Sequence, residues 1–296
     1  MSINRRRAPS PQISREKKLS GHLRESDYAT LIDGEIIRGT QKGDVIDKKG
    51  NLYSVKSGKK WQVFLYGYDR ISTSRHLHIL QPCLEAFTQD SKQYFKDRIK
   101  CIEFKEAYVK EHGRAKAKQL SNDEVVRVLG ANAYILSKEQ LAKSTFAIRN
   151  ILQNKFTLRQ FLGEALFNNE EVAFLAIKDT TYKKDELFKV FSKEDVLDVL
   201  SDRLFPEVSK PGNVPEDYNV PAQKTLLCYL KANGKSKNIV EIEIRNDSDV
   251  HYRQVRFNMY SKDALTLLLE QMDSLPVNET YSGVKVYGQA VKILEL

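Results

Sequence analysis

Residues 44–56 constrain the fold more than any other stretch, because their pattern predicts a β-hairpin. Two short apolar runs, residues 45–46 and 52–55, flank the sequence Lys-Lys-Gly-Asn at residues 48–51. Lysine, glycine and asparagine in this order are typical of a tight turn, and short alternating runs on either side are typical of paired strands. We therefore expect two adjacent antiparallel strands here.

Three polar side chains of this hairpin suit phosphodiester chemistry. Ser54 and Lys56 are two residues apart, so their side chains leave the same face of a strand, and the hairpin brings Asp44 close to both. A carboxylate oxygen suits Mg²⁺, which keeps several waters and binds a substrate phosphate. The Lys56 ammonium can orient the attacking water and offset charge that develops on the phosphoryl group. The hairpin therefore favours metal-dependent phosphodiester hydrolysis, although a basic hairpin on a solvated face has the same spacing without any catalytic role.

The same residues resemble the motif of the PD-(D/E)xK nuclease superfamily. Gly43-Asp44 stands where the family has Pro-Asp, and Ser54-Val55-Lys56 stands where it has (Asp/Glu)-x-Lys. The amino-acid sequence around the motif, up to Tyr66, is similar to that of type II restriction endonucleases. The resemblance covers a minor part of the chain. It implies an α/β fold with a PD-(D/E)xK-like mixed central sheet flanked by helices, to which we add a helical insert and a β-rich C-terminal part.

The resemblance also implies Mg²⁺ as cofactor, Asp44 as its ligand and Lys56 as the catalytic lysine. The sequence departs from the family at Ser54, which occupies the position of the second acid although serine is a poor metal ligand. Another carboxylate is then expected. Glu25 lies on the helix predicted before the sheet, where the superfamily often places a metal-binding Glu, and Glu35 begins the strand before Asp44.

Two other patterns compete as metal sites. Glu241-x-Glu243 places two acids on one strand face, but no lysine follows at the family spacing. His76-Leu77-His78 places two imidazoles on one face of an expected strand, but no nearby cysteine or acid completes a site, so a surface pair is the better interpretation.

The charge of the chain favours a polyanionic partner, which we expect to be double-stranded DNA. The 296 residues include 48 Lys plus Arg against 39 Asp plus Glu, a formal net charge of +9. The expected DNA contacts are Lys42, Lys59 and Lys60 near the hairpin, and Arg245, Arg253 and Arg256 near the C-terminus. The arginines stand among Asn and Gln residues, as in proteins that read base edges, although an ordinary polar sheet face has the same composition.

The number of cysteines and the hydropathy of the chain indicate the cellular compartment in which the protein is expected. The three cysteines, Cys83, Cys101 and Cys228, are odd in number and lack zinc spacing, which indicates a reduced, cytoplasmic environment. No apolar run is long enough to span a membrane, and no apolar segment follows the N-terminal arginines as in a secretory signal. No phosphate-cradling glycine motif is present, so no nucleotide cofactor is expected.

Proline and charge suggest four regions along the chain. Residues 1–13 form a basic, flexible arm, residues 14–205 a nuclease core with a helical insert, residues 206–222 a Pro-rich linker or loop, and residues 223–296 the β-rich C-terminal part. The linker holds four of the eight prolines.

The expected elements are as follows. Helices are predicted over 14–32, 82–113, 121–130, 137–153, from Thr157, from a Ser192 cap to 204, and over 263–272. Strands are predicted over 35–38, 45–47, 52–55, 172–177, 187–191, 251–260 and 284–294, with a hairpin of 225–232 and 239–245 around Asn233-Gly234. Residues 61–66 are a buried strand or helix. The short helices either form a small bundle or a helix-turn-helix reader that presents Lys143, Arg149, Lys155 and Arg159.

The sequence thus predicts a type II restriction endonuclease that cleaves double-stranded DNA with Mg²⁺, as a homodimer whose two-fold symmetry matches a palindromic site. Two alternatives stay open. One is a catalytically inactive nucleic-acid-binding protein with a degenerate nuclease hairpin, which Ser54 favours. The other is a repair or mobile-element nuclease of the same fold.

Overall fold

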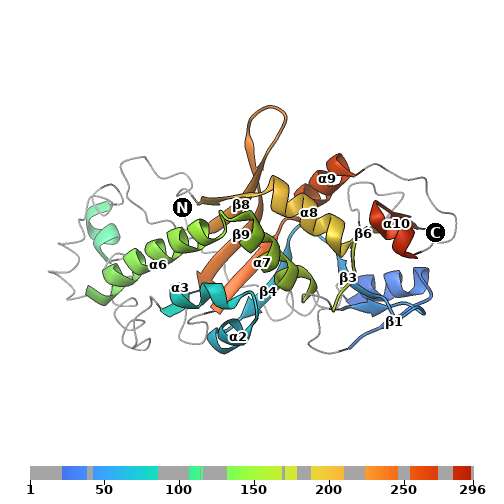
Figure 1. Cartoon of the computed structure of the whole chain (residues 1–296). Helices are drawn as coiled ribbons and strands as arrows, with labels where there is room; N and C mark the ends of the chain where they lie inside the picture. Colours follow the sequence, from blue (N-terminus) through green and yellow to red (C-terminus); the bar gives the residue numbers. More distant parts are fainter. Residues whose placement is uncertain are drawn as a thin grey trace.

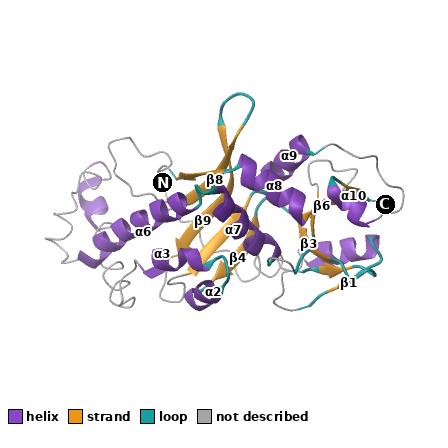
Figure 2. Cartoon of the chain, viewed as in Figure 1, coloured by secondary structure: helices purple, strands orange, loops and turns teal. Residues whose placement is uncertain are grey.

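The computed structural model describes residues 22–38, 43–85, 107–113, 115, 132–168, 171–178, 188–209, 224–245, 254–272 and 283–294. In these ranges the chain is a mixed α/β protein (Figures 1 and 2), which confirms the predicted class. The described strands divide between a six-stranded and a five-stranded sheet, and the finer PD-(D/E)xK-like arrangement stays a prediction.

The first sheet carries the predicted hairpin. Its order is β1-β2-β3-β5-β6-β11. The strands are β1 (Glu35–Ile36), β2 (Val45–Ile46), β3 (Leu52–Lys56), β5 (Phe174–Lys178), β6 (Phe188–Ser192) and β11 (Val284–Val286). Strands β1, β2 and β3 are antiparallel neighbours, β3 and β5 are parallel, β5 and β6 are antiparallel, and β6 and β11 are parallel. Strand β3 therefore has a hydrogen-bonded neighbour on each side.

A helix covers one face of this sheet. It spans residues 22–31 of the described chain, and its Tyr28 ring lies 5.4 Å from the ring of Tyr53 and 4.9 Å from that of Phe188. Helix α10 (Gln289–Leu294) packs on the same face, with β6. Residues alternate along a strand, so Tyr53 and Val55 face this helix, whereas Ser54 and Lys56 point to the opposite face.

The second sheet is antiparallel throughout, in the order β4-β10-β9-β8-β7. Its strands are β4 (Trp61–Tyr66), β7 (Phe205–Val208), β8 (Thr225–Leu230), β9 (Ser236–Arg245) and β10 (Gln254–Met259). Residues 61–66 are thus a strand, which settles the alternative that periodicity left open. The predicted hairpin around Asn233-Gly234 is confirmed, with Gly234 at φ +74°, a left-handed conformation that glycine adopts without strain.

Two helices join the sheets through a shared hydrophobic core. Helix α7 (Lys155–Phe167) packs on β4 and on α8 (Lys193–Arg203), and α8 packs on β5 and β6. Helix α9 (Ser261–Gln271) contacts α8 and β9, and α6 (Asn132–Ile151) contacts β7, β8 and β9. In Figure 1, α6 and α7 cross one face of the second sheet. The face of the first sheet that carries Ser54 is therefore the face toward α8.

The structure tests two predicted helix starts. Ser192 accepts a hydrogen bond from the backbone nitrogen of Asp195 and caps α8, as predicted. Thr157 does not cap α7, because the N-cap is Asn154, whose side chain accepts from the backbone nitrogen of Thr157. Asparagine and threonine are both good caps, and local sequence does not decide between neighbouring candidates.

The histidine pair does not lie on a strand, and that prediction is wrong. His76 lies in a turn after α2 (Tyr68–Thr73), and His78 begins the 3₁₀-helix η1 (His78–Leu80), which leads into α3 (Gln81–Glu85). Glu164 of α7 accepts hydrogen bonds from the Ser74 hydroxyl and from the backbone nitrogen of His76. This buried carboxylate holds the turn, and among the described residues neither imidazole belongs to a group that could hold a metal ion.

The predicted strand over 284–294 is also wrong in its second half. Strand β11 ends at Val286, and α10 follows. The reversal occurs at Gly288, which has φ +58° and whose added Cβ would lie 2.5 Å from Asp195 Oδ2. Asp195 in turn accepts from the backbone nitrogen of Gln289 at 2.8 Å. A contact with a helix far away in sequence thus ends the strand.

Several predictions fall outside the described residues: the arm of residues 1–13, the helix from 121, most of the 82–113 helix and most of the 206–222 linker. The proposed division into regions stays a prediction. Strand β7 covers residues 205–208, and each sheet takes strands from both sides of the linker.

Candidate active site

The hairpin of β2 and β3 forms through its turn residues. Asp47 Oδ1 accepts from the backbone nitrogens of Lys49 at 2.9 Å and Asn51 at 2.8 Å, and Oδ2 accepts from the Tyr53 hydroxyl at 2.9 Å. Gly50 has φ +87°. This side chain-to-backbone turn sets the register in which Val45 pairs with Tyr53. The predicted hairpin is confirmed.

The hairpin brings Asp44, Ser54 and Lys56 together, as the sequence predicts. Asp44 Oδ2 accepts hydrogen bonds from Lys56 Nζ at 2.8 Å, from the backbone nitrogen of Val55 at 2.7 Å and from Ser54 Oγ at 3.4 Å. The side chains of Asp44 and Lys56 are each 20% exposed. Ser54 is buried. The pair is therefore held by the sheet and still reaches solvent.

Within the described residues, this arrangement leaves one carboxylate oxygen and one ammonium N–H without a hydrogen-bond partner. All three donors converge on Oδ2, and among the described residues Oδ1 of Asp44 accepts no hydrogen bond. Lys56 Nζ also donates to the backbone oxygen of Val55 at 3.1 Å, so two of its three N–H groups are engaged within the described chain. One carboxylate oxygen and one ammonium proton remain for a cation and a substrate oxygen.

The residues fit a Mg²⁺ ion held by few protein ligands. Mg²⁺ commonly uses one or two carboxylates and completes its shell with waters and substrate phosphates, and Asp44 Oδ1 would supply one such ligand. Within the ranges that the structure describes, no group of three or more His, Cys, Asp or Glu side chains converges as a metal site. Water and substrate would therefore supply most of the coordination.

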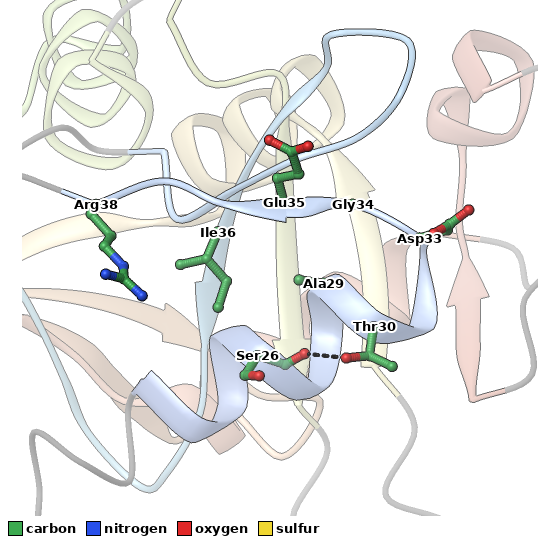
Figure 3. Close-up of a pocket in the computed structure, with 8 residues that line it drawn as sticks. All are labelled: Ser26, Ala29, Thr30, Asp33, Gly34, Glu35, Ile36 and Arg38. Carbon is green, nitrogen blue, oxygen red and sulfur yellow. Dashed lines mark hydrogen bonds between the residues drawn. The ribbon is translucent and has the colours of Figure 1, made fainter.

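The two expected extra acids lie in different places. Glu35 is exposed and pairs across β1 and β2 with Ile46. Alternation then places Glu35 on the Asp44 face, and in Figure 3 its carboxylate points away from the helix of residues 22–31. Glu25 is on that helix, which covers the opposite face, and it bonds to His22 of its own helix at 3.0 Å. The structure thus places Glu35, rather than Glu25, on the side of Asp44.

A shallow pocket lies between this helix and the edge strand β1 (Figure 3). Its lining residues are Ser26, Ala29, Thr30, Asp33, Gly34, Glu35, Ile36 and Arg38. The Thr30 hydroxyl donates to the backbone oxygen of Ser26 at 2.9 Å. Asp44 and Lys56 do not line the pocket, so it is separate from the candidate site.

Several lysines near the hairpin are engaged inside the protein. Lys48 pairs with Asp33, and Lys49 Nζ donates to the backbone oxygen of Leu294 at 3.0 Å, at the end of α10. Of the lysines expected to bind DNA, Lys60 pairs with Glu241, Lys59 has an exposed side chain, and Lys42 is outside the described residues. The basic surroundings of the hairpin are therefore partly structural.

Glu241 is the centre of a second cluster. Lys60 Nζ donates to it at 2.6 Å, the Tyr260 hydroxyl at 2.6 Å and Lys224 Nζ at 3.3 Å. Burial alone would raise the pKa of Glu241, but the hydrogen bonds from Lys60 and Tyr260 and the lysine charges outweigh burial and lower it to about 2. Burial, together with the bond to Glu241, raises the pKa of Tyr260 to about 12.

Donors thus occupy both oxygens of Glu241. This residue therefore offers no unbonded oxygen to a metal ion, which counts against Glu241-x-Glu243 as a metal site. Sequence reasoning missed Lys224 and Tyr260 as its partners. No local pattern pairs them, because β8, β9 and β10 come together only through the sheet register.

Of the three arginines expected to read bases, one has a described side chain. Arg256 of β10 pairs with Glu243, which lies directly opposite on β9. The side chain of Arg245 and all of Arg253 lie outside the described residues. Arg256 is therefore the one expected reader whose surroundings the structure shows.

Two side chains that a helix-turn-helix reader would present to DNA are engaged inside the protein. Lys155 Nζ donates to the backbone oxygens of Asp202 and Leu204, both at 2.7 Å, at the end of α8. Arg159 pairs with Glu194 and Asp198 of α8, each at 2.5 Å. These cations join α7 to α8, as expected for the small-bundle alternative.

No family model, curated protein or solved structure matches this chain. Within the described ranges, none of the helices is both long and apolar enough to cross a membrane.

Proposed function

We propose that this protein is a Mg²⁺-dependent endonuclease that cleaves double-stranded DNA, in the manner of a type II restriction endonuclease of the PD-(D/E)xK kind. One observation carries the proposal: Oδ2 of Asp44, directly before β2, and Nζ of Lys56, on β3, lie 2.8 Å apart, with the other carboxylate oxygen unused among the described residues. An acid and a lysine held this way are what the resemblance implies for a nuclease site.

The residues have distinct parts in the proposed reaction. Asp44 would hold Mg²⁺ through Oδ1, and Glu35, the acid on the same face, would approach the ion through water. Bound Mg²⁺ polarises the scissile phosphate and lowers the pKa of a water ligand. Lys56 directs an N–H toward the attacking water or a phosphate oxygen and offsets negative charge as the phosphorus centre becomes crowded. Ser54, at the position of the family's second acid, orients the Asp44 carboxylate.

The placement of β3 supports this proposal. The strand bonds to β2 on one side and to β5 on the other, so Lys56 is fixed by an internal strand rather than by a loop. Rigid strands hold reacting groups more accurately than loops do. A helix followed by a sheet that bears the acid and the lysine is also the order that the resemblance implies. A homodimer matched to a palindromic site and a cytoplasmic location remain part of the proposal.

The test is cleavage of phage and plasmid DNA with Mg²⁺ and with EDTA, using wild type, Asp44→Ala and Asp33→Ala. Asp33→Ala removes an exposed acid from a pair with Lys48 and serves as the matched control. Discrete bands that require Mg²⁺, persist in Asp33→Ala and vanish in Asp44→Ala are the expected result. DNA binding should survive in Asp44→Ala. A Mg²⁺-dependent smear would retain the nuclease and remove the restriction activity.

A second candidate is a catalytically inactive nucleic-acid-binding protein. Two observations favour it: serine stands at the second acid position, and no group of three metal-binding side chains converges in the described residues. A gel shift without any cleavage would select it. A repair or mobile-element nuclease is distinguished by mapping the cut ends, because its cuts would follow a lesion or junction rather than a fixed sequence.

A further inference from the structure

The hairpin of β8 and β9 extends beyond the second sheet as a two-stranded ribbon. Strand β7 pairs with β8 only as far as Cys228, and β10 pairs with β9 only as far as Val240, whereas β8 and β9 stay paired up to Leu230 and Ser236. In Figure 1 the loop that joins these two strands projects away from the rest of the described chain. We name residues 230–236 the ribbon tip.

Hydrogen bonds fix the conformation of the ribbon tip. The backbone nitrogen of Lys231 donates to the backbone oxygen of Lys235 at 3.0 Å, and that of Gly234, which has φ +74°, donates to the oxygen of Lys231 at 2.9 Å. Asn233 Oδ1 accepts from the backbone nitrogen of Lys235 at 3.1 Å. Lys231 and Lys235 therefore lie opposite each other, one position beyond the last strand pair, and opposite residues point to the same face.

The ribbon tip carries positive charge that no described side chain balances. Residues 218–240 include four lysines and neither Asp nor Glu. Lys231 and Lys235 are exposed, and among the described residues neither ammonium group has a hydrogen-bond or ion-pair partner. Like charges directly opposite each other on paired strands are destabilising. This lysine pair is therefore a cost to the fold, which indicates an anionic ligand.

The base of the ribbon, by contrast, is balanced in charge. Lys237 pairs with Asp263 of α9 at 3.4 Å. Burial, together with the charges of Glu270 and Asp263, raises the pKa of Tyr229, which lies opposite Lys237. The acids of α9 thus act at the base of the ribbon. Within the described chain, its unpaired charge lies at the tip, where a molecule outside the protein can reach it.

The chemistry of the ribbon tip favours the phosphates of DNA. Lysine presents a compact point charge, which suits a phosphate oxygen. The exposed apolar side chain of Leu230 points, by alternation, to the face opposite the two lysines, so the lysine face lacks the apolar area on which membrane binding depends. The major groove of a duplex admits a two-stranded ribbon, so the backbone phosphates on its borders are within reach.

We infer that the ribbon tip is a phosphate-binding arm for duplex DNA, in which Lys231 and Lys235 contact the sugar–phosphate backbone. The inference rests on the proposed function, because it takes double-stranded DNA as the ligand. The arm supplies affinity that is sensitive to salt, because each lysine on a phosphate releases condensed counterions. This affinity is independent of sequence, because phosphates carry no base information. Neither lysine is among the DNA contacts expected from the sequence.

The test measures binding of duplex DNA in EDTA, so cleavage plays no part. Wild type is compared with Lys231→Gln/Lys235→Gln, with Lys231→Arg/Lys235→Arg and with Lys48→Gln/Lys292→Gln. The last variant removes two charges from exposed lysines, at the β2–β3 turn and on α10, and is the matched control. Affinity for several unrelated duplexes is measured from about 50 to about 200 mM salt, and urea unfolding checks the fold.

We expect Lys231→Gln/Lys235→Gln to weaken binding to all duplexes alike. The slope of log affinity against log salt should fall by about 1.8, at about 0.9 for each lost phosphate contact, so the affinity advantage of wild type should shrink roughly 12-fold over this salt range. The Arg variant and the control should keep the wild-type slope. The Gln variant should be at least as stable as wild type, because the like-charge pair is removed.

Two results would overturn the inference. In one, the Gln variant keeps the wild-type slope. In the other, it loses affinity for some sequences only, which is the sign of base contacts. Wild-type binding to phosphatidylserine vesicles that requires the two lysines, with duplex affinity unchanged by their removal, would assign the ribbon tip to a membrane instead.

The inference and the proposed function can fail separately. A lowered slope in a protein that never cleaves DNA would remove the proposed nuclease activity and keep the arm. Mg²⁺-dependent cleavage by wild type, with duplex binding unchanged in the Gln variant, would do the reverse. Absence of duplex binding by wild type would remove both.

Discussion

Two carboxylate–lysine pairs invite comparison, one in each sheet. Asp44 and Lys56 approach to 2.8 Å, with both side chains 20% exposed, and Glu241 and Lys60 approach to 2.6 Å, with Glu241 11% exposed and Lys60 38% exposed. The lysines are four residues apart in sequence, on either side of the short segment that leads from β3 to β4. Distance and burial alone make the two pairs look alike.

The pairs differ in how completely the carboxylate is satisfied. At Glu241, both oxygens accept hydrogen bonds, from Tyr260 on one and from Lys60 and Lys224 on the other. At Asp44, the donors within the described part of the chain all bond to Oδ2. A saturated buried carboxylate has nothing left for a ligand and serves the fold, whereas a half-satisfied one at the edge of solvent is available for chemistry. The following predictions test this distinction.

The largest expected difference is between Lys56→Met and Lys60→Met. Lys56→Met should lower Mg²⁺-dependent cleavage by at least about 10²-fold, the usual cost of removing one preorganised donor to a developing negative charge. Lys60→Met should keep cleavage near the wild-type rate. Initial rates on supercoiled plasmid, under single-turnover conditions, measure both. Equal losses in the two variants would show that the pairs do not differ in function.

Stability should respond in the opposite sense. Glu241→Gln removes the charge that three donors share, and we expect it to lower the free energy of unfolding by about 1–3 kcal/mol. The value lies below that for a fully buried pair, because Lys60 and Lys224 are 38% and 31% exposed and can turn to water. Urea titration measures it, with Asp198→Asn, the same change at a 62% exposed acid, as control. A Glu241→Gln protein as stable as Asp198→Asn would contradict the structural role.

Acid should abolish the contribution of Glu241. Its pKa is lowered from 4.5 to about 2 in the folded protein. Ionised Glu241 therefore stabilises the folded protein fully above pH 4.5. This stabilisation, on the order of 2 kcal/mol, is lost as the pH falls toward 2. The stability difference between wild type and Glu241→Gln, measured by urea unfolding from pH 6 to pH 3, should shrink with falling pH. A constant difference would mean that ionisation of Glu241 contributes nothing.

The smallest effect is expected at the pair of Lys48 and Asp33. Their side chains are 74% and 79% exposed, so Lys48→Ala should change the free energy of unfolding by less than about 0.5 kcal/mol and leave cleavage unchanged. Unfolding in low and high salt checks this value. A loss above 1 kcal/mol would show that exposure is a poor guide to the role of these ion pairs.

The sequence by itself determined the local elements whose signals lie within a few residues. The turn of the β2–β3 hairpin, the Asn233-Gly234 hairpin and the Ser192 cap each depend on side chains bonding to nearby backbone or on a glycine with positive φ. The juxtaposition of Asp44, Ser54 and Lys56 follows from the same rules, because the period of a strand is two residues and the turn fixes the register.

Only the tertiary structure decided how these elements combine. Residues 61–66 follow β3 closely in sequence, yet they join a different sheet beside β10, and Lys60 meets Glu241 across 181 positions. The faces that Glu25 and Glu35 occupy, and the end of β11 at the Asp195 contact, also depend on distant partners. Strand pairing over such separations depends on how well the whole core packs. A local sequence pattern does not contain that information.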